Sequence, residues 1–200
     1  MNNRLFLLAT LLLLLPGCAT RSAPPADIYI VDPSLAEKVS SEAAAQSSGP
    51  VIKLAPMDAI RSFTGTEILY KRARHEQNSY AFSRWSDAPV RMLQALFQTS
   101  LSDSAQFKAV LPAASTSEAE YILESTLYDF SHHIHEGGTS SGNIRVRFYL
   151  IDQLAGTVTA TREFESTVAA TAQNARSAAE ALNQAAANVA RDLVEWLRAY

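Results

Sequence analysis

The side chains best suited to metal chemistry lie together in segment 131–136, which holds His132, His133 and His135. Side chains alternate between the two faces of a strand, so His133 and His135 would share a face, with Glu136 nearby. Imidazole and carboxylate groups are common zinc ligands, but a zinc site usually needs three or four of them. Because the spacing brings only two histidines together beside a glycine-rich loop, we expect solvated side chains at a strand end and no metal.

A second set of candidate side chains lies in the basic segment 71–75 and at Trp85. Basic clusters attract phosphates and acidic proteins, although a charged run in a hairpin is more often solvated and protects a sheet edge. A tryptophan is a frequent interface hot spot, although one just before a helix more often packs as a hydrophobic staple. Both alternatives stay open at this point. The candidate partner-binding residues are Lys71, Arg72, Arg74 and Trp85.

The sequence offers no complete pattern typical of a catalytic site. Gly138-Thr139-Ser140-Ser141-Gly142 has the Gly-x-Ser-x-Gly spacing, but it lies between two expected strands and not at the strand-to-helix turn of a nucleophile elbow. No zinc-protease helix motif occurs, and the run 137–143 lacks the lysine of a phosphate-binding loop. We therefore expect no catalytic residues and no enzymatic activity. With 17 basic and 20 acidic residues, the formal net charge is -3, so the charge balance gives no reason to expect nucleic acid as a partner.

The N-terminus has the layout of a secretory signal. Arg4 precedes an apolar run from Leu5 to Leu15, interrupted only by Thr10. As a helix this run would cover about 17 Å of a roughly 30 Å hydrocarbon core, too little to span it comfortably. Leu15-Pro16-Gly17-Cys18 resembles the lipobox of bacterial lipoproteins, which implies acylation of Cys18 and cleavage before it. The alternative is an ordinary secretory signal followed by an incidental cysteine. Cys18 is the only cysteine, so no intramolecular disulfide can form.

This reading divides the chain into residues 1–17 as signal peptide, 18–27 as lipidated tether and 28–200 as one domain. About 180 residues remain after cleavage, which suits a single core. No cofactor is expected apart from the covalent lipid on Cys18. Ala19 stands where many bacterial lipoproteins kept at the inner membrane carry Asp, so the lipoprotein resemblance implies an outer-membrane anchor facing the periplasm.

Hydrophobic periodicity predicts an α+β domain, with an antiparallel or mixed β-sheet and two long helices packed on one of its faces. The segment 67–84 is predicted as a hairpin and 121–168 as an antiparallel meander, with a loop over 137–143. The connection 34–50 is long for a compact domain, and we expect partial disorder there. The expected strands are 28–31, 51–56, 67–73, 79–84, 107–111, 121–135, 144–150 and 157–168. One expected helix is capped by Asp87, has Pro89 in its first turn and runs to about Ser104. The other runs from a capping box at Ser177 to the C-terminus.

The order of these features resembles the ABC-type transport auxiliary lipoproteins, the family that includes the PqiC component of Mce-type lipid transport systems. The resemblance covers nearly all of the chain after the signal peptide, and it rests on the order of several short stretches rather than on one diagnostic motif. Those stretches are Tyr29 to Pro33, Tyr80 with Arg84-Trp85 and the Pro89 helix, Ala119-Glu120-Tyr121, Arg145 to Asp152, Arg162-Glu163-Phe164, and the alanine-rich helix that contains Val194 to Leu197.

The resemblance implies a non-catalytic outer-membrane lipoprotein that docks a periplasm-spanning Mce-domain protein, which is served by an inner-membrane ABC transporter or a related membrane component, with lipid as cargo. A ring-shaped Mce partner further implies a homo-oligomer. The alternative is a periplasmic carrier lipoprotein that holds an acyl chain in its own groove. A hydrolase is a third possibility, disfavoured because the sequence shows no nucleophile constellation.

Overall fold

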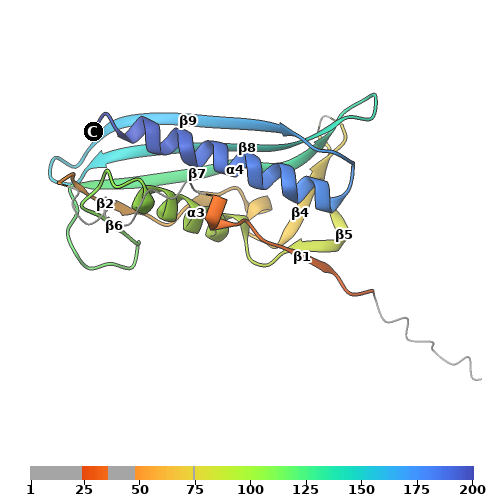
Figure 1. Cartoon of the computed structure of the whole chain (residues 1–200), viewed down its shortest axis with the longest axis horizontal. Helices are drawn as coiled ribbons and strands as arrows, with labels where there is room; N and C mark the ends of the chain where they lie inside the picture. The colour runs from red at the N-terminus through yellow and green to blue at the C-terminus, as the bar shows by residue number, and fades with distance from the viewer. Residues whose placement is uncertain (1–23, 36–47, 74) are drawn as a thin grey trace, which may run out of the picture.

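The computed structural model describes residues 24–35, 48–73 and 75–200, which form one mixed sheet of nine strands and two long helices (Figure 1). The strands are β1 Asp27–Tyr29, β2 Val51–Leu54, β3 Asp58–Ala59, β4 Glu67–Lys71, β5 Asn78–Trp85, β6 Ala109–Leu111, β7 Tyr121–Ile134, β8 Ser140–Asp152 and β9 Thr157–Ala169. The helices are α3 Pro89–Asp103 and α4 Ala175–Leu197, with short 3-10 turns η1 Pro33–Leu35 and η2 Arg61–Phe63.

Strand β7 is the shared centre of the sheet. Along one edge it pairs antiparallel with β8, from Tyr121 opposite Asp152 to Ile134 opposite Ser140, and β8 pairs antiparallel with β9. Along its other edge β2, β3 and β4 pair with β7 in parallel, one after another. β6 extends the sheet beyond β2, and β5 and β1 extend it beyond β4. The predicted α+β class, the hairpin and the meander are confirmed.

Both helices pack on the same face of this sheet. A chain of aromatic rings on that face connects the two helices. Phe97 of α3 contacts Phe148 of β8 at a centroid separation of 5.4 Å. Phe164 of β9 contacts Phe148 at 5.9 Å and Trp196 of α4 at 6.0 Å. The inward side chains of β8, at most 1% exposed, are Ile144, Val146, Phe148 and Leu150. No helix in the described part of the chain combines the length and the apolar character needed to cross a bilayer.

Helix α4 lies unusually close to β8 because small residues meet there. A Cβ atom built on Gly142 would lie 2.7 Å from the backbone nitrogen of Leu182 and 2.9 Å from the Cβ of Ala181. Such separations are far below ordinary van der Waals contact, so no larger residue fits at position 142 without moving the helix. The buried alanines of α4 that allow this approach are Ala175, Ala178, Ala179, Ala181, Ala185, Ala186 and Ala190.

Several predicted boundaries are wrong. β8 begins at Ser140, so positions 140–143 belong to the strand and the loop is shorter than expected. α4 begins at Ala175, capped by the Asn174 side chain, which accepts a hydrogen bond from the Ser177 backbone nitrogen at 2.9 Å. Asp87 does not cap α3; its carboxylate pairs with Arg91 instead. Most of the connection predicted as partly disordered, residues 36–47, lies outside the described residues.

The segment that enters the domain is held to the C-terminal helix. Asn183 of α4 donates its side-chain amide to the Ile30 carbonyl at 2.9 Å, and its side-chain oxygen accepts from the Asp32 backbone nitrogen at 2.8 Å. β1 pairs in parallel with β5, and the backbone nitrogen of Ser86 donates to the Tyr29 carbonyl at 2.7 Å. We call the pair of Asn183 hydrogen bonds the Asn183 clasp. It joins segments more than 150 positions apart.

Replacing Gly142 by Ala should lower the free energy of unfolding by ~1–3 kcal/mol, because overpacking a close helix–sheet contact forces backbone shifts. Urea unfolding followed by tryptophan fluorescence measures this. The matched control is Thr161→Ala on the exposed side of β9, which should stay within about 0.5 kcal/mol of the wild type. Equal stability of the two variants would contradict the close-approach argument.

Candidate functional site

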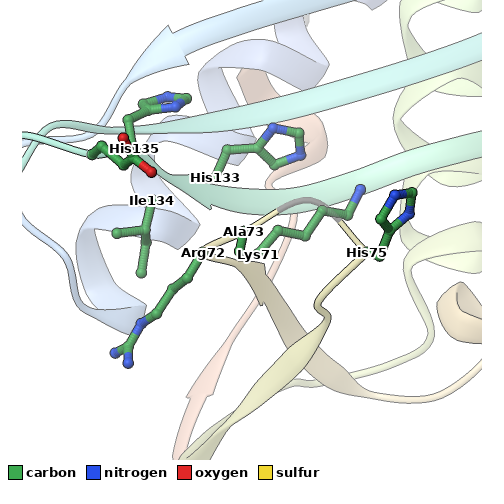
Figure 2. A pocket seen from close by; sticks show the side chains of 8 residues that line it. Lys71, Arg72, Ala73, His75, His133, Ile134 and His135 are labelled. Atoms are coloured by element: carbon green, nitrogen blue, oxygen red, sulfur yellow. The ribbon is translucent and has the colours of Figure 1, made fainter.

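Three of the four histidines of the chain line one open pocket at the end of β7 and the β4–β5 hairpin (Figure 2). The pocket has a volume of about 420 Å³ and collects basic and imidazole side chains from two segments that are distant in sequence. Its lining residues are Lys71, Arg72, Ala73, His75, His133, Ile134, His135 and Glu136. Its chemistry therefore suits an anionic group better than a cation.

A charged network forms the inner wall of this pocket. Asp129 of β7 accepts hydrogen bonds from Lys71 Nζ and pairs with His133 Nε2, both at 2.9 Å, and it also accepts from the Ser131 hydroxyl. Burial opposes ionisation of Asp129, but the hydrogen bonds from His133, Lys71 and Ser131 outweigh it and lower the pKa of the carboxyl below its ordinary value. The charge of Lys71 is therefore largely satisfied within the domain.

The outer rim of the pocket is formed by Arg72 and by the exposed imidazoles of His75 and His135. The Arg72 guanidinium is exposed and lies 5.1 Å from the centre of the Tyr70 ring, and Figure 2 shows it projecting away from Lys71. His75 is exposed in a left-handed turn with φ of 70°, and exposed His135 reaches the Ser141 hydroxyl at 3.0 Å. Arg74 lies outside the described residues. Of the predicted basic cluster, Arg72 is the described side chain most available to a partner.

His132 is in the core, so the expectation of three solvated histidines is wrong for this residue. It is 0% exposed, and its Nδ1 lies 2.7 Å from the Tyr80 hydroxyl. Burial, followed by the nearby His133 and His135, lowers the pKa of His132 to about 4, while burial raises the pKa of Tyr80 to about 12. A neutral imidazole and a hydroxyl that keeps its proton supply one donor and one acceptor, which satisfies this contact.

His132 Nε2 is buried without a hydrogen-bond partner among the described residues. Protonation would place a positive charge on this buried imidazole, and burial without a paired anion disfavours the charged form. The result is a neutral contact between β5 and β7 directly behind the charged wall of the pocket.

Trp85 is also a core residue. It is 1% exposed, and its ring centroid lies 5.3 Å from that of Phe130 on β7. The side chain therefore offers no surface to a partner in this structure, and we remove it from the candidate contact residues. The structure shows Trp85 packed in the core, in contact with Phe130 of the sheet, and not in the hydrophobic staple beside the helix that the sequence analysis left open.

Nothing in the described residues assembles a metal-binding group of three or more histidine, cysteine, aspartate or glutamate side chains. His133 is engaged by Asp129, and His132 faces the core. Lipidation of Cys18 lies outside the described residues and stays a prediction.

Asp129 and Asn183 are the residues that the sequence analysis missed. Asp129, Ser131 and His133 alternate along one strand, and that period of two could have suggested a shared face. The partners Lys71 and Ile30 lie 58 and 153 positions away from Asp129 and Asn183, respectively, so their contacts carry no local sequence signal.

Comparison with known proteins places this fold among solved structures. A family model described as "ABC-type transport auxiliary lipoprotein component" matches residues 34–194. A Xanthomonas campestris protein of known crystal structure is similar at 20% identity, over 86% of this chain and 94% of that one, with a TM-score of 0.76.

Two further structures share the architecture. One crystallised protein has 12% identity over 86% of this chain and 99% of its own, with a TM-score of 0.67. A Chlamydia trachomatis protein has 9% identity over 76% of this chain and 98% of its own, with a TM-score of 0.55. At these identities the likeness concerns the fold alone. No curated protein matched the chain in a sequence comparison.

The burial of His132 predicts a pH-dependent stability. Between pH 6.5 and about 4 the unfolded chain takes up a proton on this imidazole while the folded protein does not, so the free energy of unfolding falls as the pH falls through this window. At about 1.4 kcal/mol per pKa unit the loss is of order 3 kcal/mol. His132→Gln should remove this slope, and His135→Gln, an exposed control, should keep it. Identical slopes for wild type and His132→Gln in urea unfolding would refute the assignment.

Proposed function

The chain belongs to the family of ABC-type transport auxiliary lipoprotein components, and from this we propose that it is a non-catalytic, outer-membrane-anchored lipoprotein that docks a periplasm-spanning Mce-type protein of a lipid transport system. The observation that carries the proposal is the family match over residues 34–194, which spans every strand of the sheet except β1 and both helices up to the last turn of α4. A tethered domain of this kind contributes to transport by holding a partner at the membrane surface.

The surface of the domain favours docking over the carrier alternative. Among the described residues, the hairpin pocket and two further depressions that meet at Tyr29 of β1 are open grooves of about 390 to 440 Å³, lined by charged and polar as well as apolar side chains. A carrier shields an acyl chain in a largely enclosed apolar cavity. Among the described residues, aromatic rings of α3, β8, β9 and α4 pack against one another between the helices and the sheet.

The anchor rests on the sequence around Cys18. Several acyl chains on the mature N-terminus hold a protein on a membrane durably, whereas one chain binds only reversibly. Ala19 supports sorting to the outer membrane, as argued above. The domain then faces the periplasm, where a bridging partner can reach it.

Replacing Cys18 by Ser should abolish acylation and release or mislocalise the protein, because the thiol is the site of diacylglycerol transfer. Metabolic labelling with palmitate and membrane fractionation measure both effects. Ser22→Ala in the same tether is the control and should stay acylated and membrane-bound. Palmitate incorporation that survives Cys18→Ser would exclude Cys18 as the acylation site.

The β4–β5 hairpin is the proposed contact with the Mce-type protein. Its basic rim would guide an acidic surface of the partner, since exposed charges at an interface chiefly steer association. Changing Lys71, Arg72 and Arg74 together, as the sequence alone suggests, is a poor test. Lys71→Glu would place a second carboxylate against Asp129 and disturb the inner wall of the pocket.

The sharper variant combines Arg72→Glu with Arg74→Glu and keeps Lys71. Capture of the cognate Mce-type protein should weaken roughly tenfold, because exposed charge contacts contribute up to ~1 kcal/mol each. The control, Lys108→Glu with Arg162→Glu, makes the same charge change at exposed positions before β6 and on β9. Biolayer interferometry on the acylated protein in detergent gives the affinities. Equal affinity of the two double variants would exclude the hairpin as the contact.

We further propose that the lipoprotein acts as a homo-oligomer that matches a ring-shaped partner. Light scattering of the purified lipoprotein, alone and with the Mce-type protein, tests this at concentrations of about 10 µM or more, where weak complexes form. A monomer under both conditions would remove the oligomer from the proposal. Failure of any complex to form would remove docking itself.

A further inference from the structure

Exposed apolar side chains gather where the chain enters the domain. Ile28 on β1, Ile30 just after it and Phe82 on β5 are 51%, 56% and 56% exposed. Two open grooves meet beside them at Tyr29, one bounded by Phe82 and the other by Ile28 and Ile30. Single exposed apolar residues are common, but a contiguous set indicates a contact surface. We call Ile28, Ile30 and Phe82 the entry patch.

The backbone beneath the entry patch is firmly held. β1 pairs with β5, so that Ile28 lies opposite Arg84 on the outward side while Tyr29 lies opposite buried Trp85. The Asn183 clasp fixes Ile30 to α4 immediately afterwards. The exposure therefore belongs to an ordered surface, and an occupant gains contact without the cost of ordering a loose segment.

The tether determines what reaches this surface. Ile28 follows Cys18 by ten positions, and an extended chain covers at most ~3.6 Å per residue, so the start of the entry patch stays within about 36 Å of the anchor. A tethered surface meets the bilayer at a high effective concentration, so even weak apolar contact becomes populated. We propose that the entry patch docks on the lipid bilayer and orients the domain on it, an inference that rests on the proposed acyl anchor.

Charge around the patch is balanced. Arg84 stands opposite Ile28, and exposed Arg176 of α4 lines both grooves. Acidic side chains line the same grooves, namely Asp27, Asp32 and Glu180. Apolar contact with the acyl boundary, rather than attraction to anionic headgroups, therefore drives docking, and it should depend little on salt or lipid charge.

The structure supplies a matched reference point. Leu154, 98% exposed, lies in the turn between β8 and β9, at the end of the long strands opposite to β1 (Figure 1). A domain that rests on the bilayer through the entry patch holds Leu154 away from the lipid. Acylation consumes the thiol of Cys18, so Arg84→Cys and Leu154→Cys each provide one reactive cysteine for a fluorophore.

The experiment places the acylated full-length lipoprotein in phosphatidylcholine vesicles that contain a nitroxide-labelled lipid. Quenching at position 84 should exceed quenching at position 154 by about threefold or more, because an apolar surface that docks at the interface is buried ~5–10 Å into the boundary between headgroups and acyl chains. The difference should persist at high salt and in vesicles with phosphatidylglycerol. Mass spectrometry of the same sample reports acylation of Cys18.

Substitutions then test the patch itself. In the Arg84→Cys background, Ile28→Gln, Ile30→Gln and Phe82→Gln together should bring quenching down to the level at position 154. Ile60→Gln with Val158→Gln changes exposed apolar residues elsewhere and should leave quenching intact. Circular dichroism and urea unfolding confirm that each variant folds, and Ile28→Gln alone, with a smaller decrease, serves if the triple variant does not fold.

Each outcome decides the proposal. Equal quenching at both positions in an acylated, vesicle-bound protein overturns bilayer docking and leaves the anchor intact. An unacylated Cys18 overturns both. Quenching that needs anionic lipid overturns the apolar mode. A label at position 84 that is shielded from both the lipid nitroxide and aqueous iodide overturns the proposal in favour of a second copy of the chain covering the patch.

Discussion

Pairing along β7 is the constraint on which the rest of the described structure depends. Its β8 edge is one long antiparallel ladder, while its other edge is divided among three short parallel strands. The β4–β5 hairpin joins β7 at two pairs only, where Tyr70 lies opposite His132 and Lys71 opposite His133. The polar contacts of the pocket cluster at this short junction. They therefore supplement a strand pairing that is too brief to position the hairpin alone.

Much of this architecture is visible in the sequence because periodicity reports burial. Alternation in β8 and helical spacing in α3 and α4 follow directly from which face of each element meets the core. The buried alanines of α4 allow the helix to approach the sheet, and Gly142 shows how closely. Glycine at that position was interpreted as part of a loop, since a glycine-rich run is typical of turns and the facing helix lies some 40 positions later in the chain.

The sequence indicates which residue types could form the pocket, but not which side chains contact one another in it. A histidine-rich segment and a basic segment each stand out in the sequence, yet nothing local shows that Asp129 neutralises Lys71 or that Tyr80 covers His132. His132 and His133 are adjacent in sequence, and strand alternation sends one to the core and the other to the pocket. Trp85 followed the same rule, because it ends β5 on the inward side. Which side faces inward depends on the tertiary pairing, which the alternating pattern leaves undetermined where both faces carry mixed residues.

The Asn183 clasp has a mechanical consequence. A protein held to a surface by its first residues and gripped elsewhere by a partner carries tension along its chain, and that tension enters the fold at β1. At β1 the tension acts on the hydrogen bonds to β5. Immediately after β1 it acts on the hydrogen bonds from the Asn183 side chain of α4 to Ile30 and Asp32. The load is thereby shared between the first strand and a helix that packs on β7, β8 and β9. The segment that bears the strain is thus braced by the C-terminal helix, and peeling β1 away requires breaking both attachments.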